Sequence, residues 1–268
     1  MSENYDTKLI GVTSGRNFRE LGGYETVTGQ KIKYNKLLRT GNLANLTPQD
    51  VTLLQDYGVK YDIDFRTEKE KNEHPDIVPE GAHYEFNPVF GEDLTNASKG
   101  IFTLETSAEK DPTFGFKHML FAYEDMINGK TAQKAYQRFF EYLLTNDQDG
   151  EVLLFHCTAG KDRTGFGAFL LLSALGVPLS TIKYDYLLTN ITTKDFIDNM
   201  LKKAAANGSS QPVLQAINDI QSVYPEYLNH AVHIINVEYG SINNYLKNIM
   251  NLSMNDIMDL RRIYLKDA

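Results

Sequence analysis

Polar and apolar positions between Leu46 and Phe65 change their spacing at Gly58, from a helical pattern to a short apolar run. Thr47 is a good N-cap, Pro48 suits the first helical position, and a glycine commonly ends a helix. The pattern therefore predicts a helix that starts at Pro48 and is closed by Gly58, followed directly by a strand over residues 59–65.

A second strand and helix are predicted in the middle of the chain. The segment "GEVLLFHC", residues 150–157, is apolar throughout, which is typical of a strand buried on both faces. From Thr164 the chain reads as a helix that ends at Gly176, with Pro178 just beyond. This helix is apolar nearly all round, so it belongs in the centre of an α/β fold.

The remainder of the chain is predicted to be largely helical. Helices are expected from Ser180 to the end, with Ser241 and Ser253 as N-caps. Residues 91–115 have no clean period and predict a long loop or a lid. No linker, repeat or low-complexity tract divides the chain, so we expect a single domain over residues 1–268 with a possible insertion at 91–115.

Composition and charge limit the function. The formal net charge of −8 does not suit non-specific binding to nucleic acid or to an anionic membrane. The longest apolar run, residues 166–177, is shorter than the roughly 20 residues that span a bilayer. One cysteine and no visible signal peptide favour a cytoplasmic location, although a secreted protein whose signal peptide had been removed would look the same.

That one cysteine, Cys157, lies between the predicted strand and the predicted buried helix. The N–H groups of the intervening loop and of the helix start form a natural anion site, and the same field favours thiolate over thiol. Arg163 lies six residues further on, and its planar fork matches two phosphate oxygens. Gly160 and Gly165 permit tight curvature. A buried, inert cysteine is the alternative, but this clustering of residue types favours a nucleophile.

The loop sequence "HCTAGKDRTG" resembles the signature H-C-x5-R-[ST]-G of the cysteine-dependent phosphatases. More narrowly, it is similar to a bacterial group of atypical protein tyrosine phosphatases that also act on phosphoinositides and carry Lys-Asp-Arg in this loop. Further segments share the likeness: "NFRELGGY" (17–24), "LLRTGNLANLT" (37–47), "YDIDFRTEKE" (61–70) and "YGSINNYL" (239–246). The resemblance implies a protein-tyrosine-phosphatase-like fold, with a central, mostly parallel sheet flanked by helices.

The resemblance also implies a mechanism in two steps. Cys157 attacks phosphorus, Arg163 and the loop amides hold the oxygens, an acid protonates the leaving group, and water hydrolyses the phosphocysteine. Thr164 is expected to hydrogen-bond the sulfur. No metal and no other cofactor is implied. Phosphate binding falls to the loop residues Thr158, Ala159, Gly160, Lys161 and Thr164.

Three aspartates compete for the role of general acid. Asp162 is the favoured candidate, because the resemblance implies that the aspartate inside the loop is the acid. Many related enzymes place the acid about thirty residues upstream, near Asp125, but that segment reads as a helix. Asp64 is the third candidate. The structural alternative for Asp162 is a carboxylate that only orients Arg163 or a backbone amide.

Residues around the loop are expected to support it. His156 is expected to hydrogen-bond the loop and support the thiolate, and Lys161 to hold an inositol phosphate or pair with a neighbouring acid. Asp64 and Arg66 end a strand, where a salt bridge and a catalytic role are equally plausible. The other expected contacts are packing roles: Arg16, Asn17 and Arg19 in "NFRELGGY", which could also touch substrate, and Tyr186 behind the loop.

Four functions fit these residues to different degrees. The favoured one is hydrolysis of phosphotyrosine, with phosphoserine, phosphothreonine and phosphoinositides as further substrates. The others are a phosphatase directed mainly at phosphoinositides, a phosphate-binding module without turnover, and sulfur transfer through Cys157. The expected partner is a phosphotyrosine protein or a phosphoinositide, with no nucleic acid and no integral membrane segment.

Overall fold

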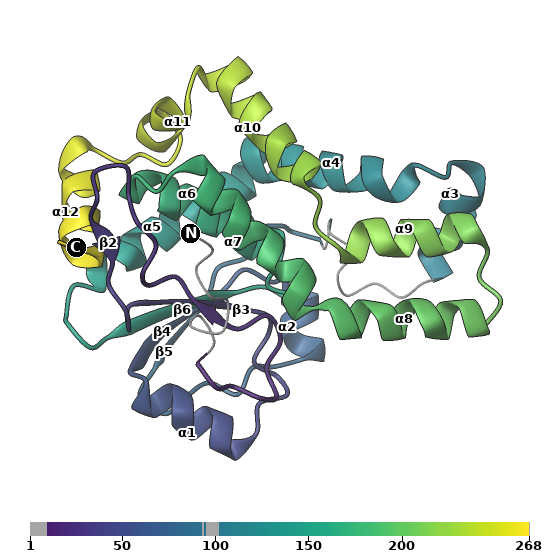
Figure 1. The fold of residues 1–268 in the computed structure, drawn as a ribbon, viewed down its shortest axis with the longest axis horizontal. Helices are drawn as coiled ribbons and strands as arrows, with labels where there is room; N and C mark the ends of the chain where they lie inside the picture. The colour runs from purple at the N-terminus through teal and green to yellow at the C-terminus, as the bar shows by residue number, and fades with distance from the viewer. Residues whose placement is uncertain (1–9, 93, 95–101, 268) are drawn as a thin grey trace.

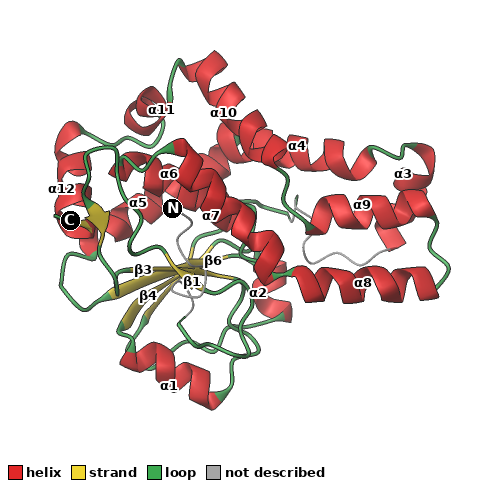
Figure 2. Ribbon diagram, in the orientation of Figure 1, coloured by secondary structure: helices red, strands yellow, loops and turns green. Residues whose placement is uncertain are grey.

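The computed structural model describes residues 10–92, 94 and 102–267, and within them a central sheet of five strands lies between layers of helices (Figures 1 and 2). The strand order is β1-β3-β6-β4-β5. β1 runs antiparallel to β3, and every other neighbouring pair is parallel, as predicted. The strands are β1 (Arg19–Glu20), β3 (Leu37–Thr40), β4 (Val59–Asp64), β5 (His83–Phe86) and β6 (Val152–His156).

Alternate residues of the strands serve two apolar cores, because side chains of a strand point to opposite faces. In β6, Leu153 and Phe155 join the large core beneath the helical layer, whereas Val152 and Leu154 join a smaller core on the other face. All five residues of β6 are buried, which confirms the prediction of a doubly buried strand. The smaller core is covered by α1 (Pro48–Asp56).

The large core is built around α6 (Arg163–Leu175), which follows the cysteine loop and ends at Gly176 in the left-handed conformation. Nearly every residue of α6 is buried, as its apolar sequence predicts. Three further helices contribute buried residues to the same core: α4 (Phe114–Asn128), α5 (Lys130–Thr145) and α7 (Leu179–Thr192). A short helix, α2 (Glu68–Glu73), lies beside the cysteine loop.

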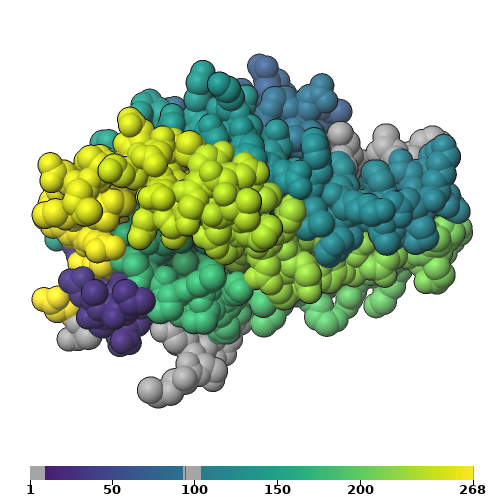
Figure 3. Space-filling model, turned by 90° about the horizontal axis from the view of Figure 1, so that it is seen from above, coloured from purple at the N-terminus to yellow at the C-terminus, as the bar shows by residue number. Residues whose placement is uncertain are grey.

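A helical arm extends from one end of the molecule (Figures 1 and 3). It combines α3 (Phe102–Lys110) and one end of α4 with α8 (Lys194–Ala206) and α9 (Gln211–Gln221), and α9 contacts the other three. The prediction of a long loop over 91–115 is therefore wrong for residues 102–110, which are helical. Residues 93 and 95–101 of that segment lie outside the described residues.

The C-terminal half is helical, as predicted, until its last residues. Ser241 and Ser253 are the N-caps of two helices, and Asp256 completes a capping box with Ser253. The chain then forms a short strand that pairs antiparallel with β2, so the prediction of helix to the end is wrong there. These elements are β2 (Lys31–Ile32), α10 (Pro225–Tyr239), α11 (Ile242–Asn248), α12 (Met254–Tyr264) and β7 (Leu265–Lys266). Among the helices described, none has the length and apolar character needed to cross a membrane.

Candidate active site

The cysteine loop lies at the carboxyl edge of the parallel strands. Cys157 directly follows β6, and α6 begins at Arg163, so the loop spans residues 157–162. Parallel neighbours β3 and β4 end beside it, which is where α/β folds place their sites. Cys157 is 2% exposed and Arg163 is fully buried. A ligand must therefore enter a recess to reach the sulfur.

Three successive carbonyls of the loop, those of residues 158–160, are held from outside. Asn42 donates to the first from its backbone N–H (3.1 Å) and its side-chain amide (3.2 Å). The side-chain amide of Asn17 donates to the second (3.1 Å) and the third (2.8 Å). Arg39 also donates to the third (2.9 Å). These three carbonyls of the loop thus each accept a hydrogen bond from residues outside the loop.

The outward carbonyls fix the direction of the amides. In a trans peptide the N–H points away from the preceding C=O, and no described peptide bond is cis. The N–H groups of Ala159, Gly160 and Lys161 therefore point to the inner side of the loop. Successive amides on a concave turn bind anions, and the unsatisfied first-turn amides of α6 add to them. The loop has the geometry of an oxyanion cradle at Cys157.

Asp185 of α7 anchors the residues that hold the loop. Its carboxylate accepts from Arg19 (2.9 Å), from Arg39 (2.5 Å) and from the hydroxyl of Tyr24 (3.0 Å). Arg19 in turn donates to the side-chain oxygen of Asn17 (2.5 Å). Burial would raise the pKa of Asp185, but the two arginines hold it at about 2. A buried ionic network therefore braces the loop from behind.

This network explains the segment "NFRELGGY". Asn17 and Arg19 are buried and bind the loop and α7, so they pack as expected. Arg16 lies 3.6 Å from the ring centre of Phe196 in α8. Sequence reasoning missed Arg39, Asn42 and Asp185 as parts of the site. Arg39 and Asn42 meet the loop across a long separation in sequence, and Asp185 acts through Arg39 and Arg19.

Arg163 is held in place by Glu70 of α2. Its two terminal nitrogens each donate to one carboxylate oxygen at 2.8 Å, and the hydroxyl of Thr158 also contacts Glu70. Burial would raise the pKa of Glu70, but Arg163 and these hydrogen bonds hold it at about 2. Thr67 and Glu70 form a capping box that fixes the first turn of α2. The feature of the sequence that could have pointed to Glu70 is the pattern T-x-x-E, which on its own indicates only the start of a helix.

Asp162 is a buried carboxylate with two different partners. One oxygen contacts the ammonium group of Lys161, which is also buried. The other accepts from the hydroxyl of Tyr123 in α4 (3.1 Å), which the sequence did not suggest. Of the two roles predicted for Lys161, the structure shows the pairing with an acid. Asp162 does not contact Arg163 in any of the hydrogen bonds described.

His156 lies in a buried acidic surrounding that favours its protonated form. Nδ1 lies 3.2 Å from the carbonyl of Cys157, which fits the predicted contact with the loop. Nε2 lies 3.2 Å from Asp62 and 3.4 Å from Asp76. Burial would lower the pKa of His156, but Asp76, Asp64 and Asp62 raise it well above its usual value. The imidazole ring therefore lies at the carboxyl end of β6, next to Cys157.

Asp64 and Arg66 form the salt bridge that the sequence allowed. Two nitrogens of Arg66 donate to the two carboxylate oxygens of Asp64 at 2.9 and 2.8 Å, and Tyr84 adds a third bond at 2.8 Å. Burial would raise the pKa of Asp64, but His156 and Arg66 lower it. In this structure Asp64 therefore makes the salt bridge, and the lowered pKa favours its ionised form.

Asp62, Asp76 and His156 are the kind of group that can hold a metal ion, since their donor atoms lie within 4.8 Å of one another. Arg66, however, contacts the same Asp76 oxygen that faces His156. In this structure the positive charge beside Asp62 and Asp76 thus comes from Arg66 and from the protonated form of His156.

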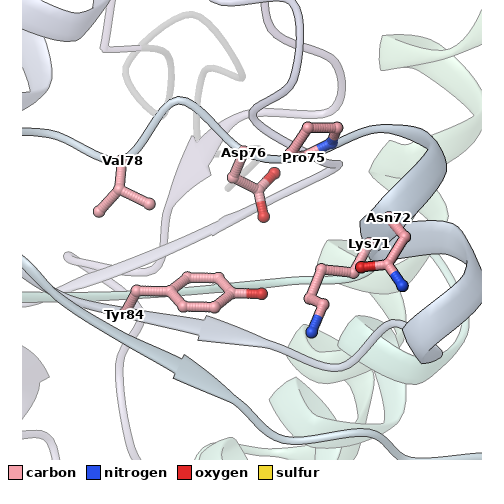
Figure 4. Close-up of a pocket in the computed structure, with 6 residues that line it drawn as sticks. All are labelled: Lys71, Asn72, Pro75, Asp76, Val78 and Tyr84. Carbon is pink, nitrogen blue, oxygen red and sulfur yellow. The ribbon is translucent and has the colours of Figure 1, made fainter.

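An open cavity of about 500 Å³ lies between α2 and β5, next to this cluster (Figure 4). Tyr84 and Asp76 point toward it, and Lys71 reaches in from α2 (Figure 4). The hydroxyl of Tyr84 is bound to Asp64, and Asp76 is bound to Arg66. Tyr84 and Asp76 therefore connect this cavity to the residues at the strand ends.

Three further sequence expectations concern Thr164, Asp125 and Tyr186. The hydroxyl of Thr164 is buried and has no hydrogen-bond partner among the described residues, so the predicted bond to the sulfur is absent from this structure. Asp125 lies on α4, as its helical context predicted, and is partly buried. Tyr186 is buried behind the loop, as expected, and its hydroxyl lies 2.8 Å from that of Tyr123.

Comparison with known proteins agrees with this geometry. The model of the tyrosine phosphatase family matches residues 10–266. The chain belongs to this family. As a tyrosine phosphatase it is 32% identical over 250 residues to a Cupriavidus necator protein whose name places it among the tyrosine-protein phosphatases, with 93% of this chain and 85% of that protein covered.

Two other relatives of the phosphatase match over different lengths. A tyrosine-protein phosphatase of Nostoc commune is 32% identical over 157 residues, which cover 58% of this chain and 48% of that protein. The triple specificity protein phosphatase PtpB of Mycobacterium tuberculosis is 26% identical over 257 residues, which cover 86% of this chain and 90% of that protein. The enzyme class that the cysteine loop predicts, a protein-tyrosine phosphatase, is confirmed.

Proposed function

We propose that this phosphatase hydrolyses phosphotyrosine through a phosphocysteine on Cys157. The observation that carries the proposal is the loop itself: three carbonyls are fastened outward, so three amides face inward at a single buried cysteine. The donors for a tetrahedral anion are thus already oriented without substrate. Preorganised donors of this kind supply the largest share of transition-state stabilisation in many enzymes.

In the first step the sulfur of Cys157 attacks phosphorus. The S–P bond forms, the bond from phosphorus to the phenolic oxygen breaks, and that oxygen receives a proton from Asp162. The charge on the equatorial oxygens is held by the loop amides and by the guanidinium of Arg163. Glu70 supports this step because its two hydrogen bonds fix the plane of Arg163.

In the second step water releases the phosphate. The oxygen of water bonds to phosphorus, the S–P bond breaks, and the electron pair returns to Cys157 as thiolate. Asp162 now acts as the base and takes the proton of the water. The imidazolium of His156 next to the carbonyl of Cys157 adds positive charge near the sulfur, which favours the thiolate as a leaving group.

Asp162 suits the acid–base role better than the other two candidates. Asp64 is locked by Arg66 and Tyr84, and Asp125 makes no described hydrogen bond to the loop. In this structure Lys161 occupies one oxygen of Asp162. The productive complex therefore requires the ammonium group of Lys161 to shift toward the phosphoryl oxygens, which leaves that carboxylate oxygen for the proton.

Burial of the loop favours phosphotyrosine among phosphorylated side chains. Cys157 is 2% exposed, so a phosphate on the short stem of serine reaches it less easily than one on a phenol ring. Phosphoserine, phosphothreonine and phosphoinositides are proposed as further, slower substrates. The name of the Mycobacterium tuberculosis relative, a triple specificity phosphatase, supports this breadth.

The test compares phosphate release by the wild type with that by Cys157→Ser. The substrates are peptides with phosphotyrosine, phosphoserine or phosphothreonine and a set of phosphoinositides. The proposal expects release by the wild type alone, fastest from phosphotyrosine. Fastest release from a phosphoinositide would instead make lipid headgroups the main substrates. Binding of vanadate without release from any substrate would leave a phosphate-binding module.

A further inference from the structure

Asp162 is joined to a chain of tyrosine hydroxyls. Tyr123 donates to Asp162 at 3.1 Å, and the oxygens of Tyr123 and Tyr186 are 2.8 Å apart. A phenol has a single proton to donate. Since that of Tyr123 goes to the carboxylate, Tyr186 must be the donor to Tyr123. The chain therefore runs from Tyr186 through Tyr123 to Asp162, with every hydrogen bond pointing at the carboxylate.

The two hydroxyls lie in a dry environment. Tyr123 is fully buried and Tyr186 is 2% exposed. Burial raises the pKa of both phenols well above the usual value, so both stay protonated and remain donors. Hydrogen bonds in series strengthen one another, more so in a low dielectric. Tyr123 comes from α4 and Tyr186 from α7, and their side chains meet beside Asp162.

The titratable groups around Asp162 come from several elements. Lys161 belongs to its own loop, and Tyr123, Tyr186, Tyr136 and Tyr227 face it from α4, α7, α5 and α10. Lys161 is the cation that directly contacts the carboxylate in this structure. Tyr123 is the neutral donor to it in the hydrogen bonds described.

We propose that Tyr123, backed by Tyr186, is a positioning residue for the acid–base chemistry of Asp162; this rests on the proposed function. Tyr123 holds Oδ1 in both steps. The exchangeable proton is thereby assigned to Oδ2, the oxygen that Lys161 contacts here. In the first step this proton passes from Oδ2 to the phenolic oxygen as the P–O bond breaks. In the second step Oδ2 takes a proton from water as the S–P bond breaks.

The test uses Tyr123→Phe on a series of aryl phosphates, because kcat/KM reports the step in which the leaving group departs. Loss of one hydrogen bond to a charged group lowers an equilibrium or rate constant that depends on it by about tenfold or more. We expect kcat/KM to fall about tenfold for phenyl phosphate, a poor leaving group that needs the acid. For an aryl phosphate with an acidic phenol the fall is expected to be about twofold at most.

The pH profile supplies a readout that a purely structural role would not move. A carboxylate that loses a donor to its ionised form holds its proton to higher pH. The alkaline limb of kcat/KM for phenyl phosphate should therefore move to higher pH in Tyr123→Phe. An unchanged limb together with an unchanged leaving-group dependence would overturn the proposal.

Two variants make the test specific. Tyr227→Phe is the matched control: its ring packs against Tyr123 at 5.9 Å between centres, but its hydroxyl is bound to the carbonyl of Asp219. It should behave as wild type. Tyr186→Phe should have a smaller effect than Tyr123→Phe. The double variant should be no worse than Tyr123→Phe alone, because Tyr186 acts through Tyr123. Additive losses would contradict the chain.

Asp162→Asn separates this proposal from the proposed function. If the wild type releases phosphate and Asp162→Asn keeps full activity on phenyl phosphate, the acid assignment fails and the role of Tyr123 fails with it. If Asp162→Asn loses activity on phenyl phosphate while Tyr123→Phe matches Tyr227→Phe, the role of Tyr123 alone is refuted.

Discussion

At the scale of single residues, the site depends on charges that are paired away from solvent. Arg163 has a bidentate partner in Glu70, and Asp162 lies between Lys161 and Tyr123. Each pair fixes a group that the chemistry needs in one orientation. Removing one partner leaves a buried charge uncompensated, which is more costly than never having the pair.

Glu70→Gln tests the anchoring of Arg163. The variant keeps the shape of the side chain but loses its charge, and breaking a buried ion pair costs about 3–5 kcal/mol. We expect a lower free energy of unfolding and a fall in kcat/KM on phosphotyrosine of about 100-fold, as is typical when a catalytic group is misplaced by about 1 Å. Denaturant unfolding and initial rates measure both.

Glu68→Gln is the matched control for Glu70→Gln. Glu68 lies in the same helix turn but is exposed. Its removal should leave kcat/KM unchanged. Equal kinetics for the two variants would show that Glu70 does not position Arg163.

Sequence reasoning reached the residues of the loop but not their partners. Cys157, Asp162 and Arg163 are close together in the chain, so their chemistry is visible in one short segment. Glu70 lies 93 positions from Arg163, and Asp185 lies 146 positions from Arg39. Contacts of this kind depend on how strands and helices are brought together, which a local pattern does not contain.

At the scale of elements, the loop is shaped by the strand ends that surround it. Gly160 has a φ of 67°, and a Cβ placed on it would lie 2.3 Å from the carbonyl oxygen of Thr40. β3 and the loop therefore touch backbone to backbone. No side chain can be inserted at this position without separating them.

Gly160→Ala should weaken phosphate binding. The new methyl group pushes the loop away from β3, which breaks the hydrogen bonds that keep the amides inward. We expect the affinity for vanadate to fall by at least about tenfold, the equivalent of one lost hydrogen bond to a charged group. Isothermal titration measures it.

Gly208→Ala is the control for backbone strain. Gly208 also has a positive φ, 86°, but nothing lies within 4 Å of its Cβ position. Alanine at this position carries the cost of a left-handed backbone conformation, about 1–2 kcal/mol, without a clash at the loop. Vanadate affinity in this variant should equal that of the wild type, and an equal loss in both variants would refute the close-contact argument.

Elements with clear caps were predicted well, and elements defined by their neighbours were not. The helix after Thr47 begins at Pro48, as its cap indicated, and the buried helix ends at Gly176, as predicted, although it begins at Arg163, one residue before the expected Thr164. Residues 102–110 lack an evident period, yet they are helical, and this helix packs on α9. β7 is a strand because β2 is available to pair with it.

At the scale of the whole molecule, buried ionic groups make stability depend on pH. The pKa values of Glu70 and Asp185 are lowered to about 2. Their stabilisation is therefore complete above the unfolded values of about 4 and is lost as the pH falls toward 2. The raised pKa of His156 works in the opposite sense. Its contribution is complete below about pH 6.5 and is lost as the pH rises through the raised value.

Urea unfolding across pH measures this profile. We expect the free energy of unfolding to fall from about pH 4 downward and from about pH 6.5 upward. In His156→Gln the decline on the alkaline side should be reduced. An identical alkaline decline in wild type and variant would show that His156 is not a buried imidazolium.

The most direct test of the central claim is to trap the phosphocysteine. The wild-type enzyme is mixed with a phosphotyrosine peptide, quenched within the first turnover, digested and analysed by mass spectrometry, with Cys157→Ser treated in parallel. The predicted result is a phosphoryl group on the peptide that contains Cys157 in the wild type. The serine variant should show neither this adduct nor phosphate release. Phosphate release by the wild type without any such adduct, or undiminished release by Cys157→Ser, would contradict the mechanism.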